Sequence, residues 1–303
     1  MESIMKISNL SKKYGGEYAV QNLNMHITQG DIYGFLGQNG SGKTTTIRMI
    51  LGLIKPTSGH VELFGEPLKK RNYHVFRRIG SMVEYPGAYE NLTAVENLEI
   101  HRKLMGIKKR DSVEEVIHLV GLSEARNKKV GEFSLGMKQR LGIGRTLLHK
   151  PEILVLDEPT NGLDPVGIKE IRELIVTLAK RDKITILVSS HLLSEIEQMA
   201  TKIGIINKGV LLEEITLNSL MKKSEQYIRI KVSDLKATIK CLTENLNIKE
   251  FTVENGVIKI YERLKETINI NRVLVTNNID VEEMCLIEEK LEDYFIKLIG
   301  GLI

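Results

Sequence analysis

The sequence predicts an α/β domain over residues 1–213, followed by a small α+β domain over residues 214–303. Short apolar runs alternate with segments of helical periodicity in the first part, and its β-branched runs are typical of a sheet that is covered on both faces. The composition changes at the boundary. All six prolines lie in the first 165 residues, and only three of the 25 glycines follow residue 213.

Composition and charge exclude several classes of protein. A hydrophobic fraction of 42%, a charged fraction of 27% and a mean hydropathy of −0.11 exclude a disordered chain. No run approaches the roughly 18 apolar residues of a membrane span, and the first residues lack the apolar core of a secretory signal. Residues 1–213 hold 30 basic against 24 acidic side chains, a net charge of +6, and residues 214–303 hold 13 against 15, a net charge of −2. Because the sum is only +4, charge alone does not indicate a nucleic-acid partner.

The first domain begins its α/β pattern with a short apolar run at residues 32–36, which predicts a buried strand. Helical character follows over residues 44–53. The runs at 153–156 and 184–188 predict two further strands, and apolar residues at helical spacing predict a helix over 168–179 between them.

The second domain has a weaker pattern. The predicted elements are strands over 227–232, 250–254, 257–261 and 281–287 and helices over 235–246, 264–275 and 288–299. Asn255-Gly256 would form the turn of a hairpin, and the order β-α-β-β-α-β-α is that of a ferredoxin-like unit with an added helix. Cys241 and Cys285 have no disulfide or metal-binding spacing, so we expect two core residues of a reduced, cytosolic protein. No catalytic constellation is visible, which favours a regulatory, dimer-stabilising or partner-docking module.

A phosphate-binding loop lies between the predicted strand at 32–36 and the helix that follows it. Residues 37–44 read GQNGSGKT, which matches the pattern G-x-x-x-x-G-K-[ST] in full. The glycines let backbone N–H groups surround phosphates at a helix N-terminus, Lys43 places a positive charge on the β- and γ-phosphates, and the Thr44 hydroxyl is a Mg²⁺ ligand. A plain glycine turn is the alternative interpretation, but the flanking strand and helix are the context that the motif requires. The expected cofactor-binding residues here are Gly37, Asn39, Gly40, Ser41, Gly42, Lys43, Thr44 and Thr45.

Two acids end the predicted strand at 153–156. Strand alternation points Asp157 and Glu158 to different sides, so that Asp157 can reach the Mg²⁺ while Glu158 polarises the attacking water. An acidic strand end that caps the next turn is the alternative interpretation, which the phosphate loop disfavours.

Four further segments indicate one specific family among the proteins that have a phosphate-binding loop. Tyr14 lies shortly before the phosphate loop, residues 133–140 read FSLGMKQR, residues 161–165 read NGLDP, and Ser189-Ser190-His191 closes the strand at 184–188. This ordered set resembles the nucleotide-binding domain of ATP-binding-cassette (ABC) transporters. The resemblance covers residues 1–213 and implies a P-loop NTPase fold, with a RecA-like core and a helical subdomain at about residues 86–150.

The resemblance also implies partners, cofactors and residue roles. The family consists of ATPases that use ATP and Mg²⁺, form a homodimer of cassettes and attach to membrane-spanning permeases at the cytoplasmic face of the membrane. Tyr14 would stack on adenine, while Ser134 and Gly136 would contact the γ-phosphate held by a second protomer. Asp164 would cross the dimer interface, and His191 would contact the γ-phosphate. A plain surface aromatic at 14 and a free surface histidine at 191 are the alternatives.

Two positions depart from the family. The signature reads Ser-Leu-Gly-Met where the commonest form is Ser-Gly-Gly-Gln, but the phosphate-facing Ser134 and Gly136 remain, so we expect binding to be kept. Glu84 stands where the family has a glutamine that approaches the metal and water and couples the site to the membrane subunit. A carboxylate at 84 can bind Mg²⁺ directly but repels the γ-phosphate. We interpret Glu84 as a working catalytic and coupling residue, and the alternative is a tolerated substitution.

A subgroup of the family shares these features. Glu84, the following Tyr85-Pro86, the segment NLTAVENL at 91–98 and the ending LEDYFIKL at 291–298 resemble ATPases that protect bacteria from lantibiotics and bacitracin. The resemblance implies a subunit of an exporter that expels such peptides from the membrane. Tyr85 and Tyr89 are candidate permease contacts, with internal packing as the alternative.

Three other functions stay open. The exporter could carry a lipid, a polysaccharide or another drug, because the membrane subunit usually recognises the cargo. A soluble ABC ATPase that acts on ribosomes or damaged DNA is disfavoured, since the chain has one cassette and no long coiled-coil insertion. A nearly inactive binding module is disfavoured because every motif residue for hydrolysis is present.

Overall fold

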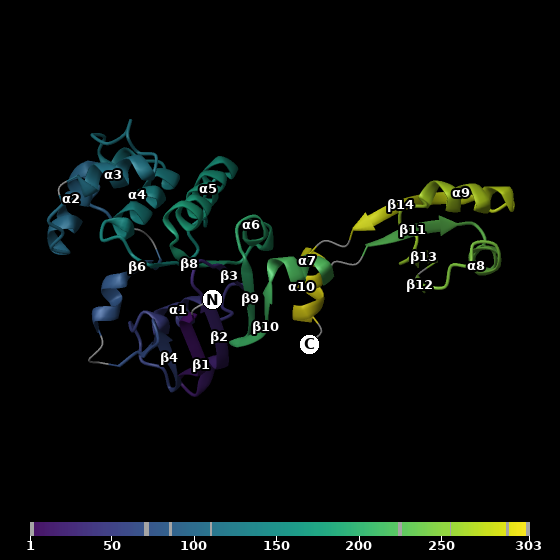
Figure 1. The fold of residues 1–303 in the computed structure, drawn as a ribbon, viewed down its shortest axis with the longest axis horizontal. Coiled ribbons are helices and arrows are strands. Elements are labelled where there is room, and N and C mark those ends of the chain that lie inside the picture. The colour runs from purple at the N-terminus through teal and green to yellow at the C-terminus, as the bar shows by residue number, and fades with distance from the viewer. Residues whose placement is uncertain are drawn as a thin grey trace. The chain divides into compact units, whose positions relative to one another are not determined.

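The computed structural model describes residues 3–69, 73–84, 87–109, 111–223, 226–254, 256–288 and 291–300. The chain divides into two compact units, Met1–Leu217 and Asn218–Ile303 (Figure 1). The boundary expected between residues 213 and 214 therefore lies four residues early. The reason is that strand β10 (Val210–Thr216) still belongs to the first unit, where it pairs with β9 (Lys202–Asn207).

A six-stranded sheet forms the centre of the first unit, in the order β10-β9-β3-β8-β7-β6. Next to β10 and β9 come β3 (Ile32–Leu36), β8 (Thr185–Ser190) and β7 (Ile153–Leu156), and β6 (Ile79–Met82) lies at the far edge. From β9 to β6 all neighbours are parallel, and every residue of β3, β7 and β8 is buried. The strands predicted at 32–36 and 153–156 are confirmed. The third runs to Ser190 instead of residue 188, because two serines continue it with buried side chains.

A second, antiparallel sheet has the order β2-β1-β4-β5. Its strands are β1 (Ser3–Tyr14), β2 (Glu17–Thr28), β4 (Ser58–Leu63) and β5 (Glu66–Pro67). Residues of this sheet, of β3 and of helix α1 (Lys43–Ile50) form one hydrophobic core. The prediction extended α1 to residue 53 and was wrong, because Leu51 caps the helix and Gly52 follows at a φ of 67° that favours glycine.

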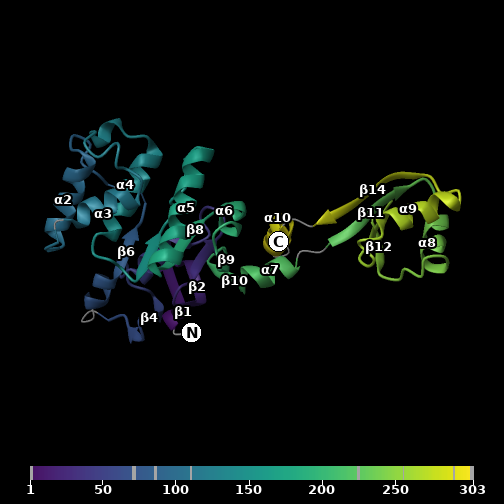
Figure 2. The ribbon, with the colours of Figure 1, turned by 45° about the horizontal axis from the view of Figure 1, so that its top comes forward.

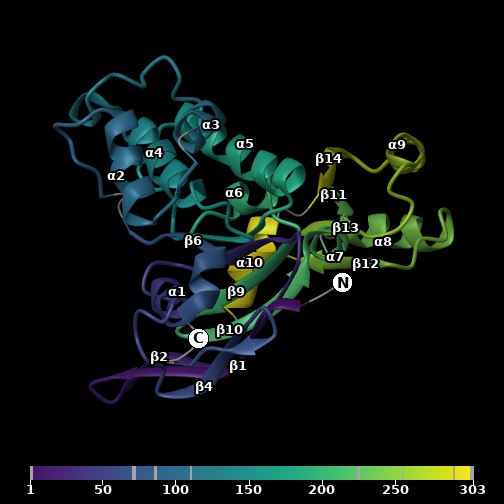
Figure 3. The same ribbon diagram turned by 60° about the vertical axis from the view of Figure 1, so that its left-hand side comes forward.

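The helical part of the first unit gathers beside the β6 end of the central sheet (Figures 2 and 3). It consists of α2 (Ala94–Leu104), α3 (Ser112–Leu119) and α4 (Leu135–Leu147), with the short 3₁₀ helix η2 (Val130–Glu132) before α4. The 3₁₀ helix η1 (Tyr73–Arg78) precedes β6 and packs Val75 into the hydrophobic core described above. Helix α5 (Pro165–Asp182) precedes β8 in the chain, and α6 (Leu193–Glu197) follows it. Helix α5 starts three residues before the predicted 168, because Asp164 caps it and Pro165 suits its first turn.

The second unit is built on a four-stranded sheet in the order β12-β13-β11-β14, with antiparallel neighbours. Its elements are α7 (Leu217–Lys223), β11 (Gln226–Val232), α8 (Leu235–Glu244), β12 (Phe251–Glu254), β13 (Val257–Ile260), α9 (Thr267–Thr276), β14 (Val281–Glu288) and α10 (Leu291–Gly300). From β11 to β14 the order is the predicted β-α-β-β-α-β, the split arrangement of ferredoxin-like units. Cys241 lies in the core, but Cys285 is only half-buried on β14, so the expectation for Cys285 was wrong.

Three residues with sequence-based expectations, Tyr85, Pro86 and Asn255, lie outside the described residues. Among the residues that the structure does describe, no helix has the length and apolar character needed to cross a membrane.

Candidate active site

The phosphate loop between β3 and α1 can be built only with glycines at its key positions. A Cβ at residue 37 would lie 2.4 Å from the Ile206 carbonyl oxygen, and one at residue 42 would lie 2.6 Å from the Ala19 carbonyl oxygen. Gly42 also has a φ of 108°. The loop therefore lies close against neighbouring backbone and continues directly into α1. The first N–H groups of this helix have no acceptor within the helix. Ser41 beside them is 4% exposed, and its hydroxyl has no partner among the described residues. Such a cradle fits the oxygens of a phosphate chain.

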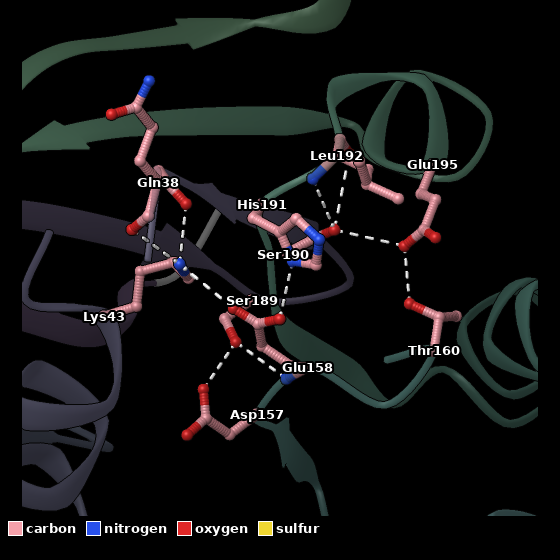
Figure 4. A network of polar contacts seen from close by, with 11 residues as sticks. Gln38, Lys43, Asp157, Glu158, Thr160, Ser189, Ser190, His191, Leu192 and Glu195 are labelled. Carbon is pink, nitrogen blue, oxygen red and sulfur yellow. Dashed lines mark hydrogen bonds and ion pairs between the residues drawn. The ribbon is translucent and has the colours of Figure 1, made fainter. Parts of the chain in front are cut away.

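Lys43 lies folded over this loop and is only 4% exposed. Its Nζ donates to the carbonyl oxygens of Gly37 at 2.6 Å and Gln38 at 3.1 Å, and it lies 3.1 Å from Oε1 of Glu158 (Figure 4). These partners match the three protons of an ammonium group, which lowers the cost of burying the charge. The lysine of the loop and the acid that follows β7 are thus brought together, as the motifs predict.

The remaining polar groups of the site lie together at the carboxyl ends of the adjacent strands β7 and β8 (Figure 4). Ser189 Oγ donates to Asp157 Oδ1 at 2.6 Å and accepts from the Glu158 N–H at 2.9 Å. His191 Nδ1 lies 2.7 Å from Glu158 Oε2. Glu158 has a φ of 47°, a left-handed conformation that turns the chain directly after the strand. His191 is therefore no free surface histidine, since it is bonded to the acid expected to polarise water.

An open cavity of about 310 Å³ lies at this edge of the sheet. The residues that line it are Asn39, Thr44, Glu84, Gln139, Asp157, Glu158 and Asn161. A threonine hydroxyl and carboxylates are hard oxygen donors of the kind that Mg²⁺ prefers. The donor set at Thr44, Asp157 and Glu84 therefore fits the predicted metal.

Glu84 follows β6 and has a φ of 65°. Its side chain is 61% exposed and forms an ion pair with Arg48 of α1. Arg48 lies one helical turn after Thr44, on the same face of α1. Glu84 thus lines the cavity while its charge is shared with an arginine that the sequence-based prediction did not include.

Four predicted residues belong neither to the phosphate loop and α1 nor to the ends of β6, β7 and β8, and among the described residues they do not line the cavity. Tyr14 ends β1 and is 49% exposed, with the Lys12 ammonium 5.1 Å from its ring centroid. Ser134 caps α4 by accepting from the Met137 N–H, and Asp164 caps α5 by accepting from the Gly167 N–H at 3.0 Å. Gly136 lies in the first turn of α4. Their roles toward a nucleotide remain predictions.

Several polar residues of the site had no predicted role. Ser189 orients Asp157, Gln139 reaches the cavity from α4, and a buried carboxylate, Glu195, accepts from Thr160 and Ser190. The available signal was the pair Ser189-Ser190 at the end of an apolar strand, since buried polar side chains require partners.

The fold and this site define a phosphate-loop ATPase of the ATP-binding-cassette class. The ABC transporter family model matches residues 20–161, and the chain belongs to this family. It is 53% identical over 302 residues to the bacitracin transport ATP-binding protein BcrA of Bacillus licheniformis, with 99% of each chain covered. It is 42% identical to the lantibiotic transport ATP-binding protein SrtF of Streptococcus pyogenes, over 70% of this chain and 90% of SrtF.

Solved structures of the same class are also similar. The dimeric cassette MJ0796, described in a post-hydrolysis state bound to ADP and Pi, is 28% identical with a TM-score of 0.62, over 71% of this chain and 99% of that chain. The predicted family, cassette fold and ATPase class are thereby confirmed. The alignment with BcrA also includes the second unit of this chain.

Proposed function

We propose that this chain is the ATP-hydrolysing subunit of an ABC exporter that expels antimicrobial peptides of the bacitracin or lantibiotic type from the bacterial membrane. The relatives named for bacitracin transport and lantibiotic transport support this cargo class. The observation that carries hydrolysis is the joining of Thr44, Asp157 and Glu158 in one cavity, with Lys43 at its edge.

The residues of the cavity divide the work. The phosphate loop binds the phosphate chain through its N–H groups, and Thr44 and Asp157 would hold Mg²⁺. When bound, Mg²⁺ neutralises charge on the phosphate oxygens. Lys43 turns toward the γ-phosphate, which frees the Glu158 carboxylate to orient a water and accept its proton. His191 holds Glu158 by the 2.7 Å contact and presents its imidazole to the γ-phosphate.

A second copy of the chain completes each site. Ser134 and Gly136 start helix α4, whose N-terminus is suited to an anionic oxygen. Because they do not line this chain's own cavity, we assign them, with Asp164, to the site of the partner protomer in a homodimer. The dimeric state named for the MJ0796 cassette supports this assembly.

The permease would dock on the helical part, at the cytoplasmic face of the membrane. A groove of about 350 Å³ is lined there by the segment at 87–89 and by side chains of α2 and α4. Tyr89 and Leu104 expose apolar surface, and Arg145 lies at the groove wall. Burial lowers the pKa of Arg145, and burial and then the Arg145 charge lower the pKa of His101. An amphipathic helix with a carboxylate fits such a groove.

A survival assay tests the cargo. The gene is deleted in its host, and the deletion is complemented with the wild type or with Glu158→Gln. We expect the deletion strain to become sensitive to bacitracin or a lantibiotic, with rescue by the wild type only. Unchanged sensitivity to both peptides, with a defect in a lipid or polysaccharide, would assign another cargo. Salt-sensitive binding of RNA or DNA by the purified chain would instead favour the soluble class of ABC ATPases.

A further inference from the structure

A buried carboxylate beside the site takes no part in the mechanism above. Glu195 of α6 is 6% exposed, and its Oε2 accepts from Thr160 Oγ1 at 2.5 Å and from Ser190 Oγ at 3.1 Å (Figure 4). Thr160 and Ser190 are buried as well. A buried charge is expensive unless hydrogen bonds compensate it. Glu195 is therefore held by these two hydroxyl groups, and it holds them in turn.

The two hydroxyl groups belong to segments with different tasks. Thr160 lies two residues after Glu158, and its carbonyl oxygen accepts from the Leu163 N–H at 3.2 Å in the turn that leads to Asp164. This turn ends at Asp164, one of the residues assigned above to the partner protomer.

Ser190 precedes His191 directly. Its Oγ accepts from the Leu192 N–H at 3.0 Å, which fixes the turn that carries the histidine. Its carbonyl oxygen accepts from the Gly37 N–H at 3.2 Å, at the start of the phosphate loop. A displacement of Ser190 would therefore reach both the His191 imidazole and the loop.

We propose that Glu195 is a positioning residue that ties the His191 turn to the segment Thr160–Asp164, so that the γ-phosphate contact and the partner-facing turn move as one piece. We call this link from Ser190 through Glu195 to Thr160 the clamp. It rests on the proposed function, because it acts between the two nucleotide sites of a dimer. Cutting it leaves each cavity lined as before, since neither Glu195 nor Thr160 lines the cavity. Nucleotide binding by one chain is thus kept, while the coupling between the two sites is lost.

The sharpest variant is Thr160→Val, which removes the hydroxyl and nearly conserves the shape. Its matched control is Thr146→Val, because Thr146 is equally 5% exposed but bonds the Ile143 carbonyl oxygen within its own helix. We expect Thr160→Val to lower kcat about tenfold, as for a lost hydrogen bond to a charged group. The Hill coefficient for ATP should fall toward 1, while the affinity for a fluorescent ATP analogue stays within about twofold. Thr146→Val should change neither kcat nor cooperativity.

A second readout does not use hydrolysis. In the Glu158→Gln background, size-exclusion chromatography measures the ATP concentration that gives half-maximal dimer. Adding Thr160→Val should raise this concentration about tenfold, and adding Thr146→Val should not. Glu195→Gln, which keeps an acceptor oxygen, should behave close to wild type, whereas Glu195→Leu should match Thr160→Val.

Equal behaviour of the two valine variants, or of Glu195→Gln and Glu195→Leu, would overturn the clamp. Thermal unfolding of each variant, together with its affinity for the ATP analogue, separates a loss of positioning from a loss of folding. A misfolded protein unfolds at a lower temperature and also fails to bind the analogue. If Glu158→Gln alone forms no ATP-dependent dimer, the proposed function fails instead, and the two failures stay distinguishable.

Discussion

The two units of this chain use their β-sheets in opposite ways. In the first unit, the parallel strands β3, β7 and β8 end at one edge, so the residues that follow them meet there. In the second unit all neighbouring strands are antiparallel, and successive strand ends fall at opposite edges. Its charges form surface pairs such as Lys231–Glu282 and Lys259–Glu254. Both units are rich in carboxylates, so the direction of the strands, and not the number of acids, decides where a site forms.

The largest expected effect separates an acid at the parallel edge from one on the antiparallel sheet. Glu158→Gln should reduce kcat about a thousandfold, within the range for a lost general base, with ATP binding kept. The control Glu283→Gln alters a surface pair with Arg229 and should leave kcat unchanged. Phosphate release measures both. A Glu158→Gln enzyme with wild-type turnover would exclude Glu158 as the base.

A core substitution in the second unit tests whether the comparison extends to stability. Leu242 is fully buried on α8, so Leu242→Ala should destabilise that unit by about 2–5 kcal/mol. ATPase activity of the full chain should stay near the wild-type value. Thermal unfolding with and without MgATP measures the stability, and the exposed Lys240→Ala on the same helix is the control. A parallel loss of activity would show that the units are not independent.

The hydrogen bond from Ser189 to Asp157 tests how finely the parallel edge is built. Ser189→Ala should lower the Mg²⁺ affinity of the nucleotide-bound protein about tenfold, as for other groups that orient a metal ligand. Ser112→Ala is the control, since Ser112 is also buried but bonds the Lys109 carbonyl oxygen. An unchanged Mg²⁺ titration of Ser189→Ala would contradict the assignment of Asp157 as a magnesium ligand.

The smallest effect concerns a surface pair of the second unit. The hydrogen bond from Lys259 lowers the pKa of Glu254 from its ordinary value of 4.5. A carboxylate with a lowered pKa stabilises the fold above the unfolded-state pKa, and this contribution is lost as the pH falls. The melting temperature of Lys259→Met should therefore lie slightly below wild type at about pH 6 and converge with it at about pH 3. A constant difference at all pH values would mean that packing, and not charge, is lost.

Much of the parallel sheet and of the site at its edge could be predicted from local sequence patterns. The phosphate loop was visible because its backbone needs glycines at fixed positions, and β3 and β7 were visible because strands buried on both faces read as unbroken apolar runs. Helix ends were less predictable, since Gly52 and Asp164 act through cap conformations and not through periodicity.

The polar partners of the site could not be predicted, because they come from distant parts of the chain. Glu84 pairs with Arg48, 36 residues earlier, and Glu195 with Thr160, 35 residues earlier. Such pairs follow only from the order of strands in the sheet. The same holds for Cys285, whose partial exposure depends on its place on β14 and not on its residue type.

The ion pair between Lys43 and Glu158 has a consequence for the design of experiments. The buried Lys43 ammonium and the partly buried Glu158 carboxylate are each other's counter-ions in this structure. Replacing Lys43 by methionine, chosen to abolish phosphate binding, also strands a carboxylate without its cation, which is more costly than losing the pair as a whole. Such a variant mixes a ligand defect with an internal charge imbalance. The double variant Lys43→Met/Glu158→Gln restores neutrality, so its nucleotide affinity, measured against that of Glu158→Gln alone, isolates the loss of the phosphate contact.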